Sequence, residues 1–295
     1  MLFFQGLELF AELPARRGGS IFDLSMNQRI PFWKMHGAAN DFIVVDDRAL
    51  TFPAHDSAWL QAIMKRHTGI GSEGVLLIQP SGTVDFRMRF FNPDGGEVDM
   101  CGNGARCIAR LAYELKVAPA HMKFETGAGV VGAEILGDQV RLTMTTPRDW
   151  RLGRRLTAAG RELAYDFVNS GVPHAVVRVD DLAGLEVQTL GAAVRYHSDF
   201  APKGTNANFI SVAGPDTIRL RTYERGVEAE TPACGTGIVA AGLIAGRTGL
   251  VKPPVKVIPA SGDTLVVDFE LTVDGADKVT LFGPAAHVFQ GELVY

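Results

Sequence analysis

Short alternating stretches dominate the apolar and polar pattern of the chain beyond roughly residue 30. In residues 84–91, bulky apolar side chains alternate with charged ones, which is the period of two typical of a half-buried strand. Similar alternation, or a compact apolar run, predicts strands at residues 42–46, 75–79, 140–144, 175–179, 218–222, 265–269 and 279–282. Gly-Asp at 137–138 and Asp-Gly at 274–275 are typical of hairpin turns. We therefore expect a structure rich in strands.

Three segments have a helical pattern instead. Asp56 or Ser57 can cap a helix that ends near Gly69. Residues 105–116 place apolar side chains at i, i+3, i+4 and i+7. Residues 233–246 carry no charge but are too few to cross a bilayer, which takes roughly 20 residues. This last segment is predicted to be a buried core helix.

The chain also resembles itself. Gly37-Ala-Ala-Asn-Asp-Phe-Ile-Val-Val parallels Gly204-Thr-Asn-Ala-Asn-Phe-Ile-Ser-Val. An alternating strand followed by a Cys-Gly-x-Gly turn and a helix occurs twice, with the cysteines at 101 and 234. The repeat predicts an α+β fold of two pseudo-symmetric domains, each a mainly antiparallel sheet wrapped around a buried central helix.

The expected domain limits follow from this repeat. Residues 29–148 together with 281–295 form an N-terminal domain that carries Cys101, and residues 149–280 form a C-terminal domain that carries Cys234. The boundary falls near 147–160, where Thr-Thr-Pro and a polar stretch are expected to interrupt the strands. Residues 1–28 have the character of a leader, either disordered or preceding a true start at Met26.

Composition and charge exclude several classes of function. Charged residues make up 21% of the 295 residues, and 29 basic residues face 33 acidic ones. Without a basic excess, a nucleic-acid or anionic-membrane partner is disfavoured. There is no apolar run long enough for a membrane span. Three cysteines are too few for a disulfide framework, so we expect a cytoplasmic protein.

Cys101-Gly-Asn-Gly and Cys234-Gly-Thr-Gly each place a thiol at a predicted helix N-terminus. The free N–H groups there favour negative charge, which predicts a lowered thiol pKa. Two such thiols facing each other suit one reaction: one takes a proton from a stereocentre and the other delivers a proton to the opposite face. The alternative is that they are small buried apolar residues, which is our interpretation of Cys107.

Two apparent motifs are discounted. Residues 127–132 satisfy G-x-G-x-x-G, but they lead into a predicted hairpin instead of opening a helix after a strand, as a dinucleotide site requires. The three Cys and seven His show no paired spacing typical of zinc ligands. We therefore expect no cofactor and no metal.

Several segments resemble the signature sequences of the diaminopimelate epimerase family: Met35-His-Gly-Ala-Ala-Asn-Asp-Phe, Asn92-Pro-Asp-Gly, Cys101-Gly-Asn-Gly-Ala-Arg-Cys, Gly204-Thr-Asn, Glu224-Arg-Gly-Val and Ala233-Cys-Gly-Thr-Gly. The resemblance runs from about Pro31 to the C-terminus. It implies a homodimeric isomerase that converts LL- to meso-diaminopimelate without pyridoxal phosphate, in lysine and cell-wall precursor biosynthesis.

The resemblance also implies roles for single residues. Cys101 and Cys234 are the acid/base pair, and Asn40 contacts the substrate at its reacting end. The α-carboxylate is held by the backbone N–H groups of Gly102, Asn103, Gly235 and Thr236. The distal carboxylate is held by Asn92, Asn206 and Arg225. Glu224 pairs with an ammonium group and tunes a thiol, and His174 lies beside the cysteines.

The sequence departs from the family pattern at the distal end of the expected site. Val172 stands where many members have an asparagine, which Asn169 could replace, and Gly74 stands where some have a glutamine. A racemase of a different amino acid on the same scaffold is therefore the first alternative. The second is a thiol redox or binding protein, since a close pair of cysteines can oxidise to a disulfide.

Overall fold

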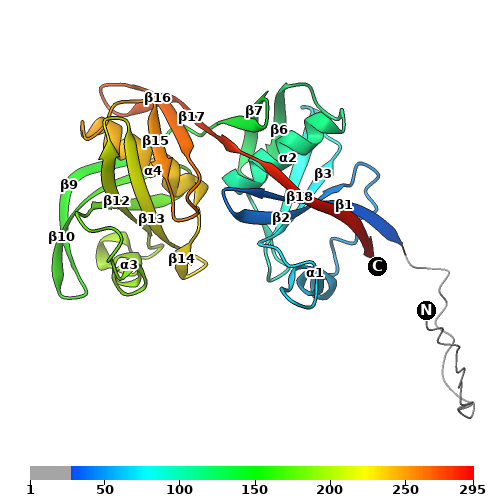
Figure 1. Cartoon of the computed structure of the whole chain (residues 1–295), viewed down its shortest axis with the longest axis horizontal. Helices are drawn as coiled ribbons and strands as arrows, with labels where there is room; N and C mark the ends of the chain where they lie inside the picture. Colours follow the sequence, from blue (N-terminus) through cyan, green and yellow to red (C-terminus); the bar gives the residue numbers. More distant parts are fainter. Residues whose placement is uncertain (1–27) are drawn as a thin grey trace, which may run out of the picture.

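The structure is a computed structural model that describes residues 28–295, so the expected leader lies outside it except for Gln28. Figure 1 shows two lobes side by side. The first contains β1 (Arg29–Gly37), β2 (Asn40–Asp46), α1 (Ser57–Met64), β3 (Val75–Gln79), β4 (Phe86–Phe91), β5 (Glu97–Val98), α2 (Gly102–Glu114), β6 (His121–Thr126), β7 (Gly129–Leu136) and β8 (Gln139–Thr143).

The second lobe contains β9 (Arg148–Ala158), β10 (Arg161–Asn169), β11 (Pro173–Arg178), α3 (Val187–Arg195), η2 (Ser198–Phe200), β12 (Asn206–Gly214), β13 (Thr217–Glu224), β14 (Ala229–Thr231), α4 (Gly235–Arg247), β15 (Val255–Ile258) and β16 (Leu265–Leu271). The chain then passes between the lobes in β17 (Ala276–Pro284) and ends in β18 (Ala286–Val294) on the first lobe.

Strand pairing shows the repeat directly. In the first lobe β1–β2 is antiparallel, β2–β3 parallel, β3–β4 antiparallel, β4–β6 parallel, and β6–β7–β8 antiparallel. In the second lobe β10–β11, β11–β12, β12–β13, β13–β15 and β15–β16–β17 follow the same order of directions. The predicted fold of two pseudo-symmetric sheets is confirmed.

Each sheet curves around one helix. The α2 helix contacts β1, β2, β3, β7 and β8, and α4 contacts strands of the second sheet from β10 to β17. From Gly235 to Gly246, α4 is buried except at Thr236, as its uncharged sequence predicts. Because sheet surrounds it, α4 can be apolar on all sides, and its glycines admit strands at close range. Cys107 is fully buried within α2, which agrees with its structural interpretation.

The two lobes share one strand and one core. β17 pairs with β16 of the second lobe and with β8 of the first, so the expected limit between residues 280 and 281 falls inside a strand. A single apolar cluster includes residues of both central helices, among them Ile108 and Ile238, and Leu281 of β17. The lobes are therefore joined by continuous packing as well as by the chain.

Most expected elements are present, with two corrections. Asp56 accepts a hydrogen bond from the Trp59 N–H at 2.9 Å and caps α1, but this helix ends at Met64 and not near Gly69 as expected. Residues 127–132 form the turn and first strand residues of the β6–β7 hairpin, which confirms that they open no helix. The polar stretch at 147–160 does not interrupt the strands: it contains β9, which pairs along β10. Because most side chains of β9 are exposed, its sequence lacks the alternation of apolar and polar residues that predicts a strand.

Candidate active site

The two central helices meet at their N-termini. Cys101 and Cys234 occupy the N-cap positions of α2 and α4, each with an extended backbone conformation. A Cβ added at Gly235 would lie 3.4 Å from the Cα of Gly102, so the first turns of the helices touch. The free N–H groups of both helices therefore converge on one region, which is a suitable environment for an anion.

Amide side chains connect the two cysteine segments. The Cys101 thiol donates to Asn40 Oδ1 at 3.7 Å. The Asn103 amide donates to the same oxygen at 3.3 Å and to the Ala233 carbonyl at 3.0 Å, next to Cys234. The Asn103 side chain therefore connects the first lobe to the second through hydrogen bonds next to both cysteines.

Asn40 is placed by a strained turn. Gly37 and Asn40 pair at the end of the β1–β2 hairpin, and the two residues between them, Ala38 and Ala39, have φ values of 56° and 61°. A two-residue turn with both central residues in the left-handed region matches strand twist, but for non-glycine residues it costs of order 1 kcal/mol each. Such strain is typical of a segment whose geometry serves a site.

A half-buried acidic side chain lies beside the second cysteine. Glu224 ends β13 and accepts a hydrogen bond from Thr231 Oγ1 at 2.8 Å. Burial raises the pKa of Glu224, although hydrogen bonds from Thr231 and from the Cys234 thiol oppose this. Cys234 also lies 3.7 Å from Thr236 Oγ1.

The electrostatics of the thiols differ from the sequence prediction. Burial raises the pKa of Cys101, and the backbone N–H groups of Asn103 and Gly104 only partly oppose it. Burial also raises the pKa of Cys234 well above its usual range, and the charge of Glu224 adds to the effect. The predicted lowering was wrong for the free protein, because loss of hydration outweighs the helix N-terminus.

Two parallel strands bring together three of the residues predicted to bind the substrate. His174 at the start of β11 pairs with Asn206 at the start of β12. The Asn206 side chain accepts from the Arg225 backbone N–H at 2.8 Å and donates to the Pro173 carbonyl at 3.0 Å. His174 is 0% exposed, and burial, followed by the charge of Arg225, lowers its pKa to about 3.

One predicted residue stands apart from these networks. Asn92 begins the tight turn between β4 and β5, where its backbone bonds to Gly95 and Gly96. Within residues 28–295, its side chain has no hydrogen bond to another predicted site residue. The structure otherwise groups Asn40, Cys101 and Asn103 at one cysteine, Glu224, Cys234 and Thr236 at the other, and His174, Asn206 and Arg225 together.

Sequence reasoning missed Arg106. This arginine follows Cys101 by five positions on α2, is 0% exposed, and donates to Asn103 Oδ1 at 2.9 Å. The available signal was an arginine inside the apolar stretch of a helix that begins at a candidate catalytic cysteine.

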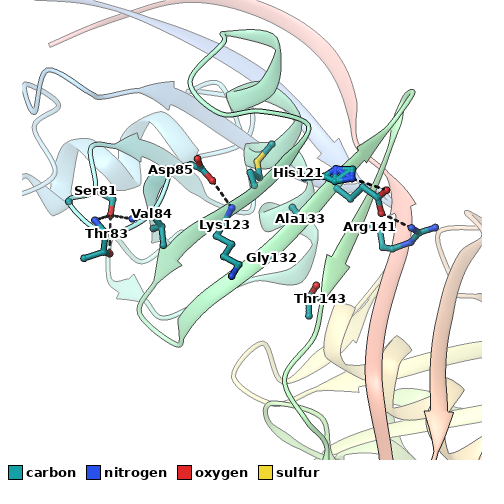
Figure 2. Close-up of a pocket in the computed structure, with 13 residues that line it drawn as sticks. Ser81, Thr83, Val84, Asp85, His121, Lys123, Gly132, Ala133, Arg141 and Thr143 are labelled. Atoms are coloured by element: carbon teal, nitrogen blue, oxygen red, sulfur yellow. Dashed lines mark hydrogen bonds and ion pairs between the residues drawn. The ribbon is translucent and has the colours of Figure 1, made fainter.

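A separate hollow lies on the first lobe. Figure 2 shows it between β6–β8 and the loop before β4. Its volume is about 770 Å³. Two of its charged lining residues, Arg141 and Glu134, form an ion pair. None of the predicted site residues lines it.

Two further searches concern the described residues only. No group of three or more His, Cys, Asp or Glu in residues 28–295 is arranged to hold a metal ion. Over the same residues, no helix is long and apolar enough to cross a membrane.

The fold and site define a class of two-lobed proteins in which paired sheets enclose two facing helices. A solved phenazine biosynthesis protein of the PhzF family from Bacillus anthracis is similar over 91% of this chain and all of its own, with a TM-score of 0.71 and 17% identity. A hydroxyproline epimerase from Agrobacterium vitis is similar over 90% of this chain and 92% of its own, with a TM-score of 0.65 and 18% identity. At these identities the likeness shows the fold.

The chain belongs to the diaminopimelate epimerase family. The family model "Diaminopimelate epimerase" matches residues 32–150 and 167–288. The diaminopimelate epimerase of Aquifex aeolicus is 42% identical over 89% of this chain and 97% of its own length. The diaminopimelate epimerase of Chlorobaculum tepidum is 42% identical over 88% of this chain and 99% of its own length. The diaminopimelate epimerase of Archaeoglobus fulgidus is 39% identical over 90% of this chain and 96% of its own length.

Proposed function

We propose that the protein epimerises LL-2,6-diaminopimelate to meso-diaminopimelate by a two-base thiol mechanism, without an organic cofactor. Relatives named diaminopimelate epimerase, at about 40% identity over nearly the whole chain, support the substrate. The observation that carries the mechanism is the pair of cysteines, one at the N-terminus of each of two abutting helices.

The chemical step moves two protons. Whichever thiol is ionised takes the α-proton and becomes neutral. The other gives its proton to the opposite face of the carbon and becomes a thiolate, so the pair keeps the same total charge. The developing negative charge on the α-carboxylate side is held by N–H groups of Gly102, Asn103, Gly235 and Thr236, which are already oriented and need no reorganisation.

Glu224 links substrate binding to thiol ionisation. Its negative charge raises the pKa of both thiols in the free protein. An α-ammonium group placed against Glu224 would cancel that charge, so the substrate itself would favour the thiolate that attacks it. This arrangement keeps the thiols neutral until a substrate is present.

The distal end of the substrate carries a second ammonium and a second carboxylate group. We assign the binding of this carboxylate to Arg225, Asn206 and Asn92, with His174 packed next to Asn206. The guanidinium and two amides supply the donors that a carboxylate needs. The Asn169 Oδ1 accepts from the Gly171 N–H at 3.1 Å, which orients the side chain and leaves its Nδ2, the donor that a carboxylate needs, to replace the asparagine missing at Val172.

Incubation of LL-diaminopimelate with the protein in deuterated water tests the function. We expect meso product that carries deuterium at the inverted α-carbon, with no added cofactor. Absence of both meso product and α-deuterium would reject the proposal.

Cysteine variants test the mechanism. Cys101→Ala and Cys234→Ala each remove one of the two proton carriers, so each should lower kcat at least about 1,000-fold, in the range for loss of an essential acid or base. Cys107→Ala, in the core of α2, should keep most of the activity. Retained turnover in both of the first two variants would instead favour a thiol redox or binding protein.

The second candidate is a racemase of another amino acid. Val172 at the expected distal end and the fold shared with a hydroxyproline epimerase motivate it. Chiral chromatography of a panel of L-amino acids separates the two: turnover of a monocarboxylate without turnover of diaminopimelate would select the racemase.

We also infer a cytoplasmic homodimer of two-domain subunits, in which residues 29–148 with 281–295 form one domain, residues 149–280 form the other, and strand β17 is shared between them. All three cysteines are free, which suits a reducing compartment. β18 pairs on one side with β1 and exposes Val288, Phe289, Val294 and Tyr295, an apolar edge that a second copy could cover. Light scattering of the wild type and of Phe289→Lys would test the assembly: the wild type should have twice the mass of the variant.

A further inference from the structure

Arg106 is a cation in the protein interior without an anionic partner. It is the largest of the fully buried side chains. Its Nε donates to the Pro284 carbonyl at 3.1 Å, and its two Nη atoms donate to the Gly102 carbonyl at 3.4 Å and to Asn103 Oδ1 at 2.9 Å. All three acceptors are neutral, and none of the ion pairs within residues 28–295 includes Arg106.

A glycine on β1 makes room for this side chain: a Cβ on Gly37 would lie 3.0 Å from Arg106 Nη2. On β17, a Cβ on Gly283 would be in ordinary contact with Arg106 Nε, at 3.5 Å. The guanidinium therefore fills a space enclosed by the end of β1, the crossing strand β17 and the first turn of α2. Burying a charge costs several kcal/mol unless something compensates it, so neutral acceptors alone are a poor reason to keep an arginine here.

Arg106 is connected to both catalytic segments through Asn103. The same Asn103 side chain accepts from Arg106 and donates to the Ala233 carbonyl and to Asn40 Oδ1. Asn40 in turn accepts from the Cys101 thiol. Loss of the guanidinium fork would free the Asn103 side chain to rotate. The contact between the first turns of the two helices would then be weakened.

In the proposed reaction a thiolate forms at Cys101, which would give Arg106 a negative charge within the same network. The ionisable groups that act on Cys101 are Glu224, which disfavours its thiolate, and Arg106, which favours it. Burial lowers the pKa of Arg106, and Cys107, Cys101 and Asp263 oppose this lowering; a guanidinium still keeps its proton at neutral pH. Burial raises the pKa of Cys107 to about 12, so this thiol stays neutral and offers no counter-charge.

We propose that Arg106 is a positioning residue that fixes Asn103 between the two cysteine segments and supplies the permanent positive charge against which the Cys101 thiol ionises. The role rests on the proposed epimerase function. It adds to that function a residue that touches no substrate and acts through Asn103 and Cys101.

The test compares Arg106→Gln, Arg106→Lys and the wild type by the pH dependence of Cys101 alkylation with iodoacetamide, resolved by mass spectrometry of the labelled residue. Arg106→Gln should move the midpoint upward by about one pH unit or more, the effect of removing a nearby opposite charge. Arg106→Lys keeps the charge but loses the fork. It should keep the wild-type midpoint yet lower kcat about tenfold or more with little change in KM, since a displaced Asn103 affects the reacting geometry.

Arg110 offers a matched control on the same helix. It donates to the Ala285 carbonyl, next to the acceptor of Arg106, but it is paired with Glu114 at 2.8 Å. Arg110→Gln should leave the alkylation midpoint unchanged.

A folded Arg106→Gln protein with the wild-type midpoint would overturn the charge role. Should that variant not fold, Arg106→Lys decides: wild-type kcat in Arg106→Lys would overturn the positioning role. Alkylation of Cys101 requires no turnover. If the protein were inactive toward diaminopimelate, the proposed function would be rejected, but the effect of Arg106 on Cys101 could still be measured.

Discussion

At the scale of the single residue, burial controls the ionisation of His174. The ring is 0% exposed, its Nδ1 lies 3.1 Å from the Asn208 amide, and its Nε2 has no partner within residues 28–295. Together with the nearby charge of Arg225, this environment lowers the pKa to about 3, so the fold holds the neutral ring.

His174 should therefore set an acid limit on stability. In the unfolded chain the ring takes up a proton below pH about 6.5, whereas in the folded chain it stays neutral down to about 3. Stability is lost as the pH falls between these values. From pH 7 to pH 5 the loss due to this group is about 2 kcal/mol. Between pH 7 and pH 5, the free energy of unfolding of His174→Gln should fall by about 2 kcal/mol less than that of the wild type. Urea unfolding of both proteins at both pH values measures this difference. An identical pH dependence in the variant would contradict this.

The cysteines show what local sequence could and could not give at this scale. The two Cys-Gly-x-Gly segments were enough to predict that each thiol begins a helix. The direction of the pKa shift was not predictable, because it depends on burial in the folded structure and on Glu224, which lies on β13, paired with the β14 strand that precedes Cys234. Arg106 was overlooked for the same reason, since its acceptor Pro284 is distant in sequence.

At the scale of the element, the glycines of α4 have two distinct uses. A Cβ on Gly242 would lie 2.9 Å from the Val267 Cβ, closer than packed side chains allow. A Cβ on Gly235 would make ordinary contacts, 3.4 Å from Gly102 Cα and 3.6 Å from the Asn103 nitrogen. The first glycine lets the sheet approach the helix, and the second keeps the N–H groups of the facing helix accessible.

These uses predict opposite outcomes for the same substitution. Gly242→Ala should cost about 1–3 kcal/mol through overpacking against β16 and should leave kcat of the folded protein nearly unchanged. Gly235→Ala should leave stability within about 1 kcal/mol, because alanine favours the helix. It should lower kcat about 100-fold by covering a donor to the α-carboxylate. Urea unfolding and steady-state rates of both variants check this, and the reverse pattern would reject our placement of the carboxylate.

Elements were predictable from sequence where burial gives a regular pattern. β3 is buried at every position and lies where its apolar run predicts, at residues 75–79. The sequence analysis missed α3. Its buried residues have helical spacing, but only four positions carry this pattern, and one of them is a glycine: Val187, Leu190, Gly191 and Val194. β9 could not be found by alternation, since most of its side chains are exposed.

At the scale of the whole molecule, two repeats share a strand and an apolar core. β17 completes both sheets, and the cluster around α2 continues into the cluster around α4. The hydrogen bond from Asn103 to the Ala233 carbonyl joins the lobes again at the site. Separation of the lobes would therefore expose apolar surface in each and leave β17 without one of its partners.

We expect the lobes to unfold together for this reason. Trp33 and Trp59 lie in the first lobe, and Trp150 lies on β9 of the second, where Arg247 stacks over its ring. Fluorescence of Trp150→Phe thus reports on the first lobe, and a Trp33→Phe, Trp59→Phe double variant reports on the second. Each midpoint of thermal unfolding should coincide, within about 2 °C, with the calorimetric midpoint of the same variant, as for a cooperative unit. A lobe whose fluorescence changes at a temperature well below that midpoint would show that β17 and the shared core do not couple the repeats, since the less stable lobe would then open alone.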